Sequence, residues 1–330
     1  MAYEKRFYEQ AESNIKARRM KAENELNARI SEVESNIPEI SEIRRQLSGT
    51  SVELSKLILK RDGDFQKNFE KIRDQNMQGQ KMIKNLLKNG GYSENYLEPV
   101  YYCNICCDKG YTQNGRCECF DKLLNKLAVE KLNTEANMPD CDFEHFSLSY
   151  YNNKTDNGVD CRTKMEANFN YCKDYAESFT LDSSSLFLLG KTGVGKTHIS
   201  LAIAKRVTER GYTVAYGSIL NYLRIIEKEH FGRSENPEND TMQVLINTDL
   251  LILDDLGSEF RTSFYESAVY NIINSRINLG LPTIISSNLS IAELQKSYND
   301  RIISRIFGVF DTLMFVGEDV RQIKRLHGEI

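Results

Sequence analysis

The fold of this 330-residue chain is decided by residues 186–197, which read LFLLGKTGVGKT. Apolar residues typical of a buried strand run into a glycine-rich loop, and the amphipathic residues 198–210 follow as a predicted helix. The spacing G-x-x-x-x-G-K-T after a strand and before a helix is that of a phosphate-binding loop. A glycine-rich turn with a chance lysine would not account for the flanking strand and helix.

Each residue type in this loop has a physical reason. Glycine tolerates positive φ and lets backbone N–H groups approach phosphate oxygens, while the following helix N-terminus adds partial positive charge. We expect Lys196 to bridge the β and γ phosphates of a nucleotide and the Thr197 hydroxyl to ligate magnesium. The predicted nucleotide-binding residues of the loop are Gly190, Lys191, Thr192, Gly193, Val194, Gly195, Lys196, Thr197 and His198.

The composition bounds the class of protein. With 40% hydrophobic and 27% charged residues, the chain is typical of a soluble globular protein of about two domains. A net charge of −4 gives no global attraction to DNA, so nucleic-acid contact would need a local basic patch. We find no apolar run of membrane-spanning length and no signal-peptide core, and therefore expect a cytoplasmic protein without membrane contact.

Residues 1–100 are poor in proline and glycine and predict a helical or coiled-coil arm. Apolar residues recur there at alternating four- and three-residue steps, the spacing of a coiled-coil seam. These residues are Leu26, Ile30, Val33, Ile37, Ile40 and Leu47, with interruptions at Pro38 and Arg44. Interleaved acidic and basic residues indicate a solvated polar face. The seam either folds back as a helical hairpin or faces a partner protein.

Residues 101–135 contain a predicted metal site and a linker helix over 121–131. Cys103 and Cys106 form a C-x-x-C pair, and Cys117 and Cys119 form a C-x-C pair further along. Two thiolate pairs on tight turns can close a tetrahedral shell around Zn²⁺, and such a closed site is structural. An iron–sulfur cluster or unbound thiols are the alternatives, and Cys107 is the leftover thiol.

Residues 136–330 alternate short apolar runs with helical patterns, which predicts a parallel sheet covered by helices on both faces. The runs are 186–189, 213–216, 250–253, 283–286 and 313–316. The third run ends in Asp254 and Asp255, at the strand end where ligands of such sheets bind. We expect Asp254 to join Thr197 in holding magnesium and Asp255 to polarise the attacking water. The short reach of Asp255 suggests slow hydrolysis, with Glu259 as a substitute base.

Further polar residues follow the later runs. Asn288 is expected either to orient the water at the γ-phosphate or to form a strand-end turn. Arg301 and Arg305 lie one helical turn apart, and form either a solvated face or an arginine finger that reaches a neighbouring subunit. Arg321 is placed to touch the subunit's own nucleotide. Aromatic residues in 141–151 either hold adenine or pack in the core.

As an ordered set, these motifs resemble the AAA+ ATPases of the DnaC/DnaI helicase-loader family, over 140–330. The motifs are 190–197, 250–257, 283–288, 300–307 and 317–321. The resemblance implies an AAA+ P-loop core without a full lid domain, since the chain stops shortly after the fifth run. It implies Walker A roles for Lys196 and Thr197, Walker B roles for Asp254 and Asp255, sensor one for Asn288, the finger for Arg305 and sensor two for Arg321.

The resemblance also implies what the remaining segments do. The arm and the cysteine segment would hold the DnaB-type replicative helicase hexamer, and an extra helix over 218–231, with Arg224 and Lys228, would engage single-stranded DNA. ATP, Mg²⁺ and Zn²⁺ are the implied cofactors, and the AAA+ domain would self-associate. Alternatives are an IstB-type transposase-helper ATPase acting on duplex DNA, a P-loop small-molecule kinase, and an adaptor that ATP only stabilises.

Overall fold

The computed structural model describes residues 3–60, 65–135, 141–151, 155–156, 159–232, 240–260 and 262–328. The chain divides into two compact units, one comprising Met1–Ala11 with Asp121–Ile330 and the other comprising Glu12–Phe120. The predicted ATPase domain starts at residue 136, and residues 136–140 lie outside the described residues.

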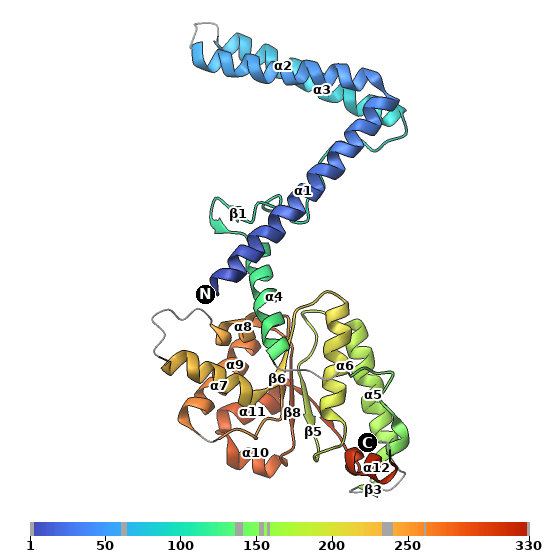
Figure 1. The fold of residues 1–330 in the computed structure, drawn as a ribbon, viewed down its shortest axis with the longest axis vertical. Helices are drawn as coiled ribbons and strands as arrows, with labels where there is room; N and C mark the ends of the chain where they lie inside the picture. Colours follow the sequence, from blue (N-terminus) through green and yellow to red (C-terminus); the bar gives the residue numbers. More distant parts are fainter. Residues whose placement is uncertain are drawn as a thin grey trace. The chain divides into compact units, whose positions relative to one another are not determined.

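Long helices build most of the smaller unit (Figure 1). They are α1 (Lys5–Asn36), which belongs to this unit from Glu12 onward, α2 (Pro38–Lys60) and α3 (Phe65–Asn89). Pro38 is the first residue of α2, a position where its missing N–H leaves no helical bond unmade. Helices α2 and α3 pack against each other, and Val33, Ile40 and Leu87 are buried together. The helical-hairpin alternative is therefore confirmed for this part of the seam.

The cysteine segment follows in the same unit. A short antiparallel hairpin joins β1 (Tyr111–Thr112) to β2 (Gly115–Arg116), and it lies between the two cysteine pairs. Helix α4 (Glu118–Glu135) begins directly after Cys117. The hairpin turns the chain back so that the second cysteine pair returns to the first.

The larger unit is built on a sheet of five parallel strands in the order β6-β7-β8-β5-β9. The strands are β5 (Leu186–Leu189), β6 (Val214–Ser218), β7 (Leu250–Asp254), β8 (Thr283–Ser287) and β9 (Asp311–Met314). This confirms the predicted five-stranded parallel sheet. Strand β9 begins before the predicted run 313–316 because its residues pair with the short strand β5, from Leu186 opposite Asp311 to Leu189 opposite Met314.

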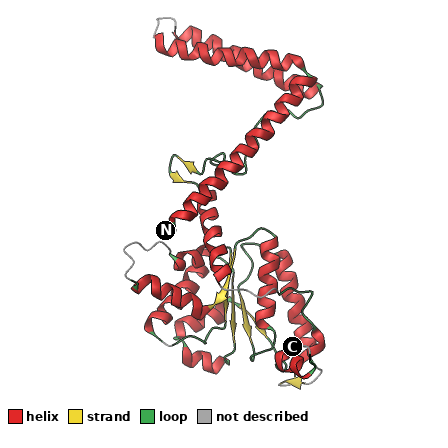
Figure 2. Ribbon diagram, in the orientation of Figure 1, coloured by secondary structure: helices red, strands yellow, loops and turns green. Residues whose placement is uncertain are grey.

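Helices cover both faces of this sheet (Figure 1). In Figure 2 the yellow strands of the five-stranded sheet lie between red helices. Helices α5 (Cys161–Ser178) and α6 (Lys196–Glu209) lie on one side. The other side carries α7 (Ile219–Phe231), α8 (Thr241–Asn247), α9 (Ser263–Leu279), α10 (Ile291–Ser297) and α11 (Asp300–Val309). Strand residues alternate accordingly: Leu186 and Leu188 pack with Ile199 of α6, whereas the Phe187 ring lies 5.7 Å from that of Phe307 in α11.

Shorter elements complete the unit. They are the 3-10 turn η1 (Leu148–Tyr150), the strands β3 (Thr155–Asp156) and β4 (Val159–Asp160), and α12 (Val320–Leu326). After β9, the described residues contain no helix other than α12. Across the described part of the chain, no helix has both the length and the apolar character that a membrane crossing requires.

Candidate nucleotide-binding and metal sites

The predicted phosphate loop connects the carboxyl end of β5 to the first turn of α6. Gly193 and Gly195 have φ values of +80° and +90°, which favour glycine. A Cβ atom on Gly193 would lie 2.0 Å from a carboxylate oxygen of Asp319, so a side chain has no room there. Gly195 caps α6 without a side-chain hydrogen bond. The first N–H groups of α6 are therefore available to an anion.

Lys196 is the first residue of α6 and is buried beside this loop. Its Nζ donates hydrogen bonds to the carbonyl oxygens of Gly190 (2.6 Å) and Lys191 (2.8 Å) and to Oδ1 of Asn288 (2.6 Å). Burial lowers the pKa of Lys196 to about 8, although the nearby carboxylates Asp255 and Asp254 favour its charged form. The ammonium group is thus held beside the loop by acceptors that a phosphate could replace.

Asp254 ends strand β7 and faces the start of α6. Its Oδ2 accepts a hydrogen bond from the Thr197 hydroxyl at 3.0 Å. A carboxylate and a hydroxyl at this distance supply the oxygen ligands that Mg²⁺ prefers. The residues therefore fit a magnesium ion, which Thr197 and Asp254 would hold.

Asp255 follows in a left-handed conformation with φ +63°. Its N–H donates to the Ser286 hydroxyl at 2.9 Å, and its Oδ1 accepts from Asn288 Nδ2. Burial raises the pKa of Asp255, and the neighbouring Asp254 raises it further. Asn288 therefore links the Asp255 carboxylate to the Lys196 ammonium through the two ends of one amide.

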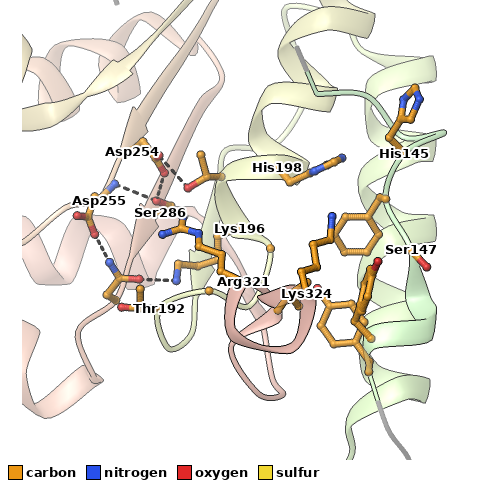
Figure 3. A pocket seen from close by; sticks show the side chains of 18 of the residues that line it. His145, Ser147, Thr192, Lys196, His198, Asp254, Asp255, Ser286, Arg321 and Lys324 are labelled. Atoms are coloured by element: carbon orange, nitrogen blue, oxygen red, sulfur yellow. Dashed lines mark hydrogen bonds between the residues drawn. The ribbon is translucent and has the colours of Figure 1, made fainter. Parts of the chain in front are cut away.

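These side chains line a cavity of about 500 Å³ (Figure 3). The predicted residues that line it are Thr192, Gly193, Gly195, Lys196, Thr197, His198, Asp254, Asp255, Asn288 and Arg321. The predicted loop residues Gly190, Lys191 and Val194 do not line it. Val194 is buried in the core, and the carbonyl groups of Gly190 and Lys191 bind the Lys196 ammonium instead.

Helix α12 is fastened to the phosphate loop by its own backbone. The Val320 N–H donates to the Gly193 carbonyl at 3.0 Å, and this contact sets Arg321 at the cavity wall. Lys324, one turn later, also lines the cavity and lies 5.2 Å from the centre of the Tyr150 ring. Lys324 was missed from the sequence, although its i+3 spacing from Arg321 was a usable signal.

The aromatic residues of 141–151 contribute to both the cavity and the core. Phe146, Tyr150 and Tyr151 line the cavity, and Tyr151 also packs in the core with Phe143. The Phe146 ring stacks on that of Tyr151 with centroids 5.8 Å apart. The segment thus supplies both an aromatic cavity wall and core packing.

His198 holds this segment against α6. Its Nε2 lies 2.7 Å from the Asp142 carbonyl oxygen, so Nε2 carries the proton and donates. The Asp142 carboxylate in turn accepts from His145, which holds the pKa of Asp142 at about 2. His198 therefore joins the phosphate-loop helix to the chain that forms the aromatic wall.

Three other predicted residues do not line the cavity. Arg305 stands outside it, where its Nε donates to Asn274 at 2.7 Å and its guanidinium lies 4.9 Å from the Tyr270 ring centre. Arg301 is exposed on the same helix. Glu259 accepts hydrogen bonds from the Tyr298 hydroxyl and from the Gly257 N–H at 2.9 Å, so it does not face the phosphate loop. Glu259 as a substitute base is not supported.

The cysteine cluster fits a tetrahedral metal site. The Sγ atoms of Cys103, Cys106, Cys117 and Cys119 all lie within 4.8 Å of one another. Cys103 and Cys117 are 3.8 Å apart and Cys106 and Cys119 are 3.5 Å apart, close to the edge of about 3.8 Å of a tetrahedron with Zn–S bonds of about 2.3 Å. The thiols are not joined as disulfides.

Backbone contacts support the shape of this cluster. The carboxylate of buried Asp108 accepts from the N–H groups of Tyr102 (2.8 Å) and Cys103 (2.9 Å), and Gly110 N–H donates to the Cys106 sulfur at 3.3 Å. Cys107 is not among the four clustered thiols, as the sequence predicted. These residues would hold a structural Zn²⁺ with every tetrahedral position filled by sulfur.

The chain is similar in sequence to proteins named replicative helicase loaders. Over 166 residues the chain is 25% identical to the Replicative helicase loader DnaC of Escherichia coli (strain K12), covering 50% of this chain and 62% of that protein. It is 26% identical over 268 residues to the Replicative helicase loader DnaI of Bacillus subtilis (strain 168), covering 71% and 83% respectively. A crystal structure of the DnaC helicase loader superposes with a TM-score of 0.44 at 21% identity, covering 53% of this chain and 98% of that one.

The family described as IstB-like ATP binding protein matches residues 122–324. That range includes the phosphate loop, both carboxylates of the β7 end, Asn288 and Arg321. The match extends over more than half of the chain. The chain belongs to the IstB-like ATP binding protein family.

Proposed function

We propose that this protein is an ATP-controlled loader that delivers a DnaB-type replicative helicase hexamer onto single-stranded DNA during replication initiation or restart. The main observation behind this proposal is the cavity lined by Lys196, Asp254, Asn288 and Arg321. This arrangement occurs in a chain similar to proteins named replicative helicase loaders. A cytoplasmic location is part of the proposal.

The cavity supports binding and hydrolysis of ATP. The N–H groups at the start of α6 and the Lys196 ammonium would hold the phosphates, and the aromatic wall beside Phe146 would hold the base. Bound Mg²⁺ supplies charge neutralisation at the phosphates. Asp255 would polarise the attacking water, and Asn288 would orient it. Hydrolysis would be slow, because the short Asp255 side chain is held back by its hydrogen bond to Asn288.

Self-association would complete the site. Arg305 is half-buried and lies outside its own subunit's cavity, on a helix that also carries the exposed Arg301. We propose that Arg305 reaches the γ-phosphate bound to a second copy, as an arginine finger in trans. An alanine at Arg305 would then leave ATP binding intact and remove ATP hydrolysis by the assembled protein.

The N-terminal segments would carry the helicase. We propose that the arm over 1–100 and the zinc-holding segment over 101–135 bind the helicase, whereas 136–330 form the ATPase domain. Helix α7 presents Arg224 and Lys228 to solvent, and their charges suit a nucleic-acid backbone. We propose that this helix engages single-stranded DNA.

A transposase-helper ATPase that acts on duplex DNA is the second candidate. The observation that favours it is the IstB-like description of the matched family. The two candidates share the ATP site and differ in their protein partner and in the form of DNA. Partner binding, and not ATP turnover, therefore separates them.

The test is native mass spectrometry of the full-length protein mixed with the DnaB-type helicase of the same cell, with ATP and zinc present. We expect a defined complex that carries several copies of the protein per helicase hexamer. Lys196→Ala is the control variant and should lose ATP-dependent assembly and ATP-dependent binding to single-stranded DNA. If no helicase complex forms while ATP and zinc are bound, and duplex DNA is bound instead, the transposase-helper function replaces the loader.

A further inference from the structure

The Asp254 carboxylate receives hydrogen bonds from hydroxyl groups on three different elements. Oδ2 accepts from Thr197 at 3.0 Å and from the Tyr216 phenol at 2.9 Å, and Oδ1 accepts from Ser286. Thr197 is a residue of the phosphate loop, but Tyr216 and Ser286 are not. Their hydroxyl groups are not explained by nucleotide contact alone.

Tyr216 and Ser286 flank Asp254 because of the strand order. Strand β7, which Asp254 ends, lies between β6, which carries Tyr216, and β8, which carries Ser286. All three side chains are buried, with exposed fractions of 7% for Tyr216, 1% for Ser286 and 9% for Asp254. In such surroundings a carboxylate cannot rotate away without leaving a polar group unpaired.

Ser286 has a second contact that extends this arrangement. Its hydroxyl oxygen accepts a hydrogen bond from the Asp255 N–H at 2.9 Å, and the same hydroxyl group donates a hydrogen bond to the Asp254 carboxylate. One hydroxyl group therefore orients the Asp254 carboxylate and anchors the left-handed backbone of Asp255. Ser286 therefore contacts both acidic residues at the end of β7, Asp254 through its carboxylate and Asp255 through its backbone.

We propose that Tyr216 and Ser286 are positioning residues that hold the Asp254 carboxylate in the orientation required for Mg²⁺–nucleotide binding. The inference rests on the proposed ATP site and names the groups that support it. Hydrogen bonds to a metal-holding carboxylate keep it oriented before the metal arrives, so less reorganisation is needed on binding. Tyr216 does not line the cavity, and the hydroxyl of Ser286, which does line it, is already bonded to Asp254.

The experiment measures the affinity of the full-length protein for a fluorescent, non-hydrolysable ATP analogue, once with excess Mg²⁺ and once with EDTA. The ratio of the two affinities reports how strongly the metal supports nucleotide binding. We expect Tyr216→Phe to reduce this ratio by at least about tenfold, with the EDTA affinity nearly unchanged. Ser286→Ala should reduce the ratio in the same way.

Tyr222→Phe provides a matched control. Tyr222 is also a buried tyrosine at the β6–α7 end of the sheet, and among the described residues its hydroxyl has no hydrogen-bond partner. Removing that hydroxyl should leave the Mg²⁺ ratio unchanged. A drop of equal size in Tyr216→Phe and Tyr222→Phe would show a general packing effect and overturn the proposal.

The outcomes separate this inference from the proposed function. If the wild-type protein binds the analogue more tightly with Mg²⁺ and both Tyr216→Phe and Ser286→Ala keep the wild-type ratio, the positioning role is wrong and the ATP site stands. If the wild-type protein shows no Mg²⁺-dependent binding at all, the ATP site and this inference fail together. Thermal unfolding without nucleotide checks that each variant is folded.

Discussion

The affinity for ATP should fall as the pH rises above about 8, because Lys196 must be charged to bind phosphate. Burial depresses the pKa of Lys196 from 10.5 to about 8 in the nucleotide-free protein. A lysine is charged below its pKa, so the affinity for ATP is highest at pH values below the pKa of Lys196 and falls at pH values above it. The second ionisation of a phosphate group, at about pH 6, lies below the pH range in which Lys196 loses its charge.

The size of the effect follows from the charged fraction of Lys196. With a pKa of about 8, about 90% of the molecules carry the charge at pH 7 and about 10% at pH 9. If the bound phosphates keep Lys196 charged in the complex, the ATP affinity falls about tenfold between these pH values. This corresponds to about 1.4 kcal/mol of binding free energy.

Fluorescence titration with a labelled ATP analogue at constant ionic strength, in steps from pH 7 to pH 9, measures this dependence. Lys196→Arg is the matched control, since a guanidinium stays charged across the whole range. The variant should bind with an affinity that does not depend on pH. A wild-type affinity that stays constant up to pH 9 would refute the argument that burial sets the charge of Lys196.

Three further predictions concern folding and binding. Arg276→Met should lower the free energy of unfolding in urea by about 4 kcal/mol, because the buried guanidinium donates to backbone carbonyls in the last turn of α8, at Thr248 before β7 and at Pro282 before β8. Gly193→Ala should abolish ATP binding in a filter assay while the protein stays folded, because the new Cβ would meet the Asp319 carboxylate. Cys117→Ser, or zinc chelation, should increase proteolysis within 101–120 and release zinc to a colorimetric reporter, without changing ATP affinity.

Much of the fold could be predicted from the sequence because its signals are local. The apolar runs of the strands alternate with helical patterns, and parallel strands bring their carboxyl ends to one edge of the sheet. That geometry places Asp254, Asn288 and the loop before Lys196 together without knowledge of any particular contact. The spacing of the cysteine pairs acts in the same local way, since the first pair lies about a turn and the second at the start of α4.

Other features depend on contacts between elements that are distant in the chain. Glu259 follows the carboxylate pair closely in sequence, yet it bonds Tyr298 and the Gly257 backbone. The local pattern of residues did not indicate whether the Glu259 side chain would point toward the nucleotide cavity or toward Tyr298. The turn after β7 is held against β8 by a backbone hydrogen bond from the Leu256 N–H to the Ser286 carbonyl, a contact between segments that are distant in the chain.

The sequence by itself determined the phosphate loop, the four clustered cysteines and the strand that carries Asp254, since each is a short run with a period or spacing of its own. Only the tertiary structure decided that Tyr216 and Ser286 flank that carboxylate and that Lys324 faces the aromatic wall. Strands β6 and β8 lie on either side of β7 although they are far from it in the chain. Side chains on neighbouring strands meet according to register, and register is settled by packing of the whole sheet.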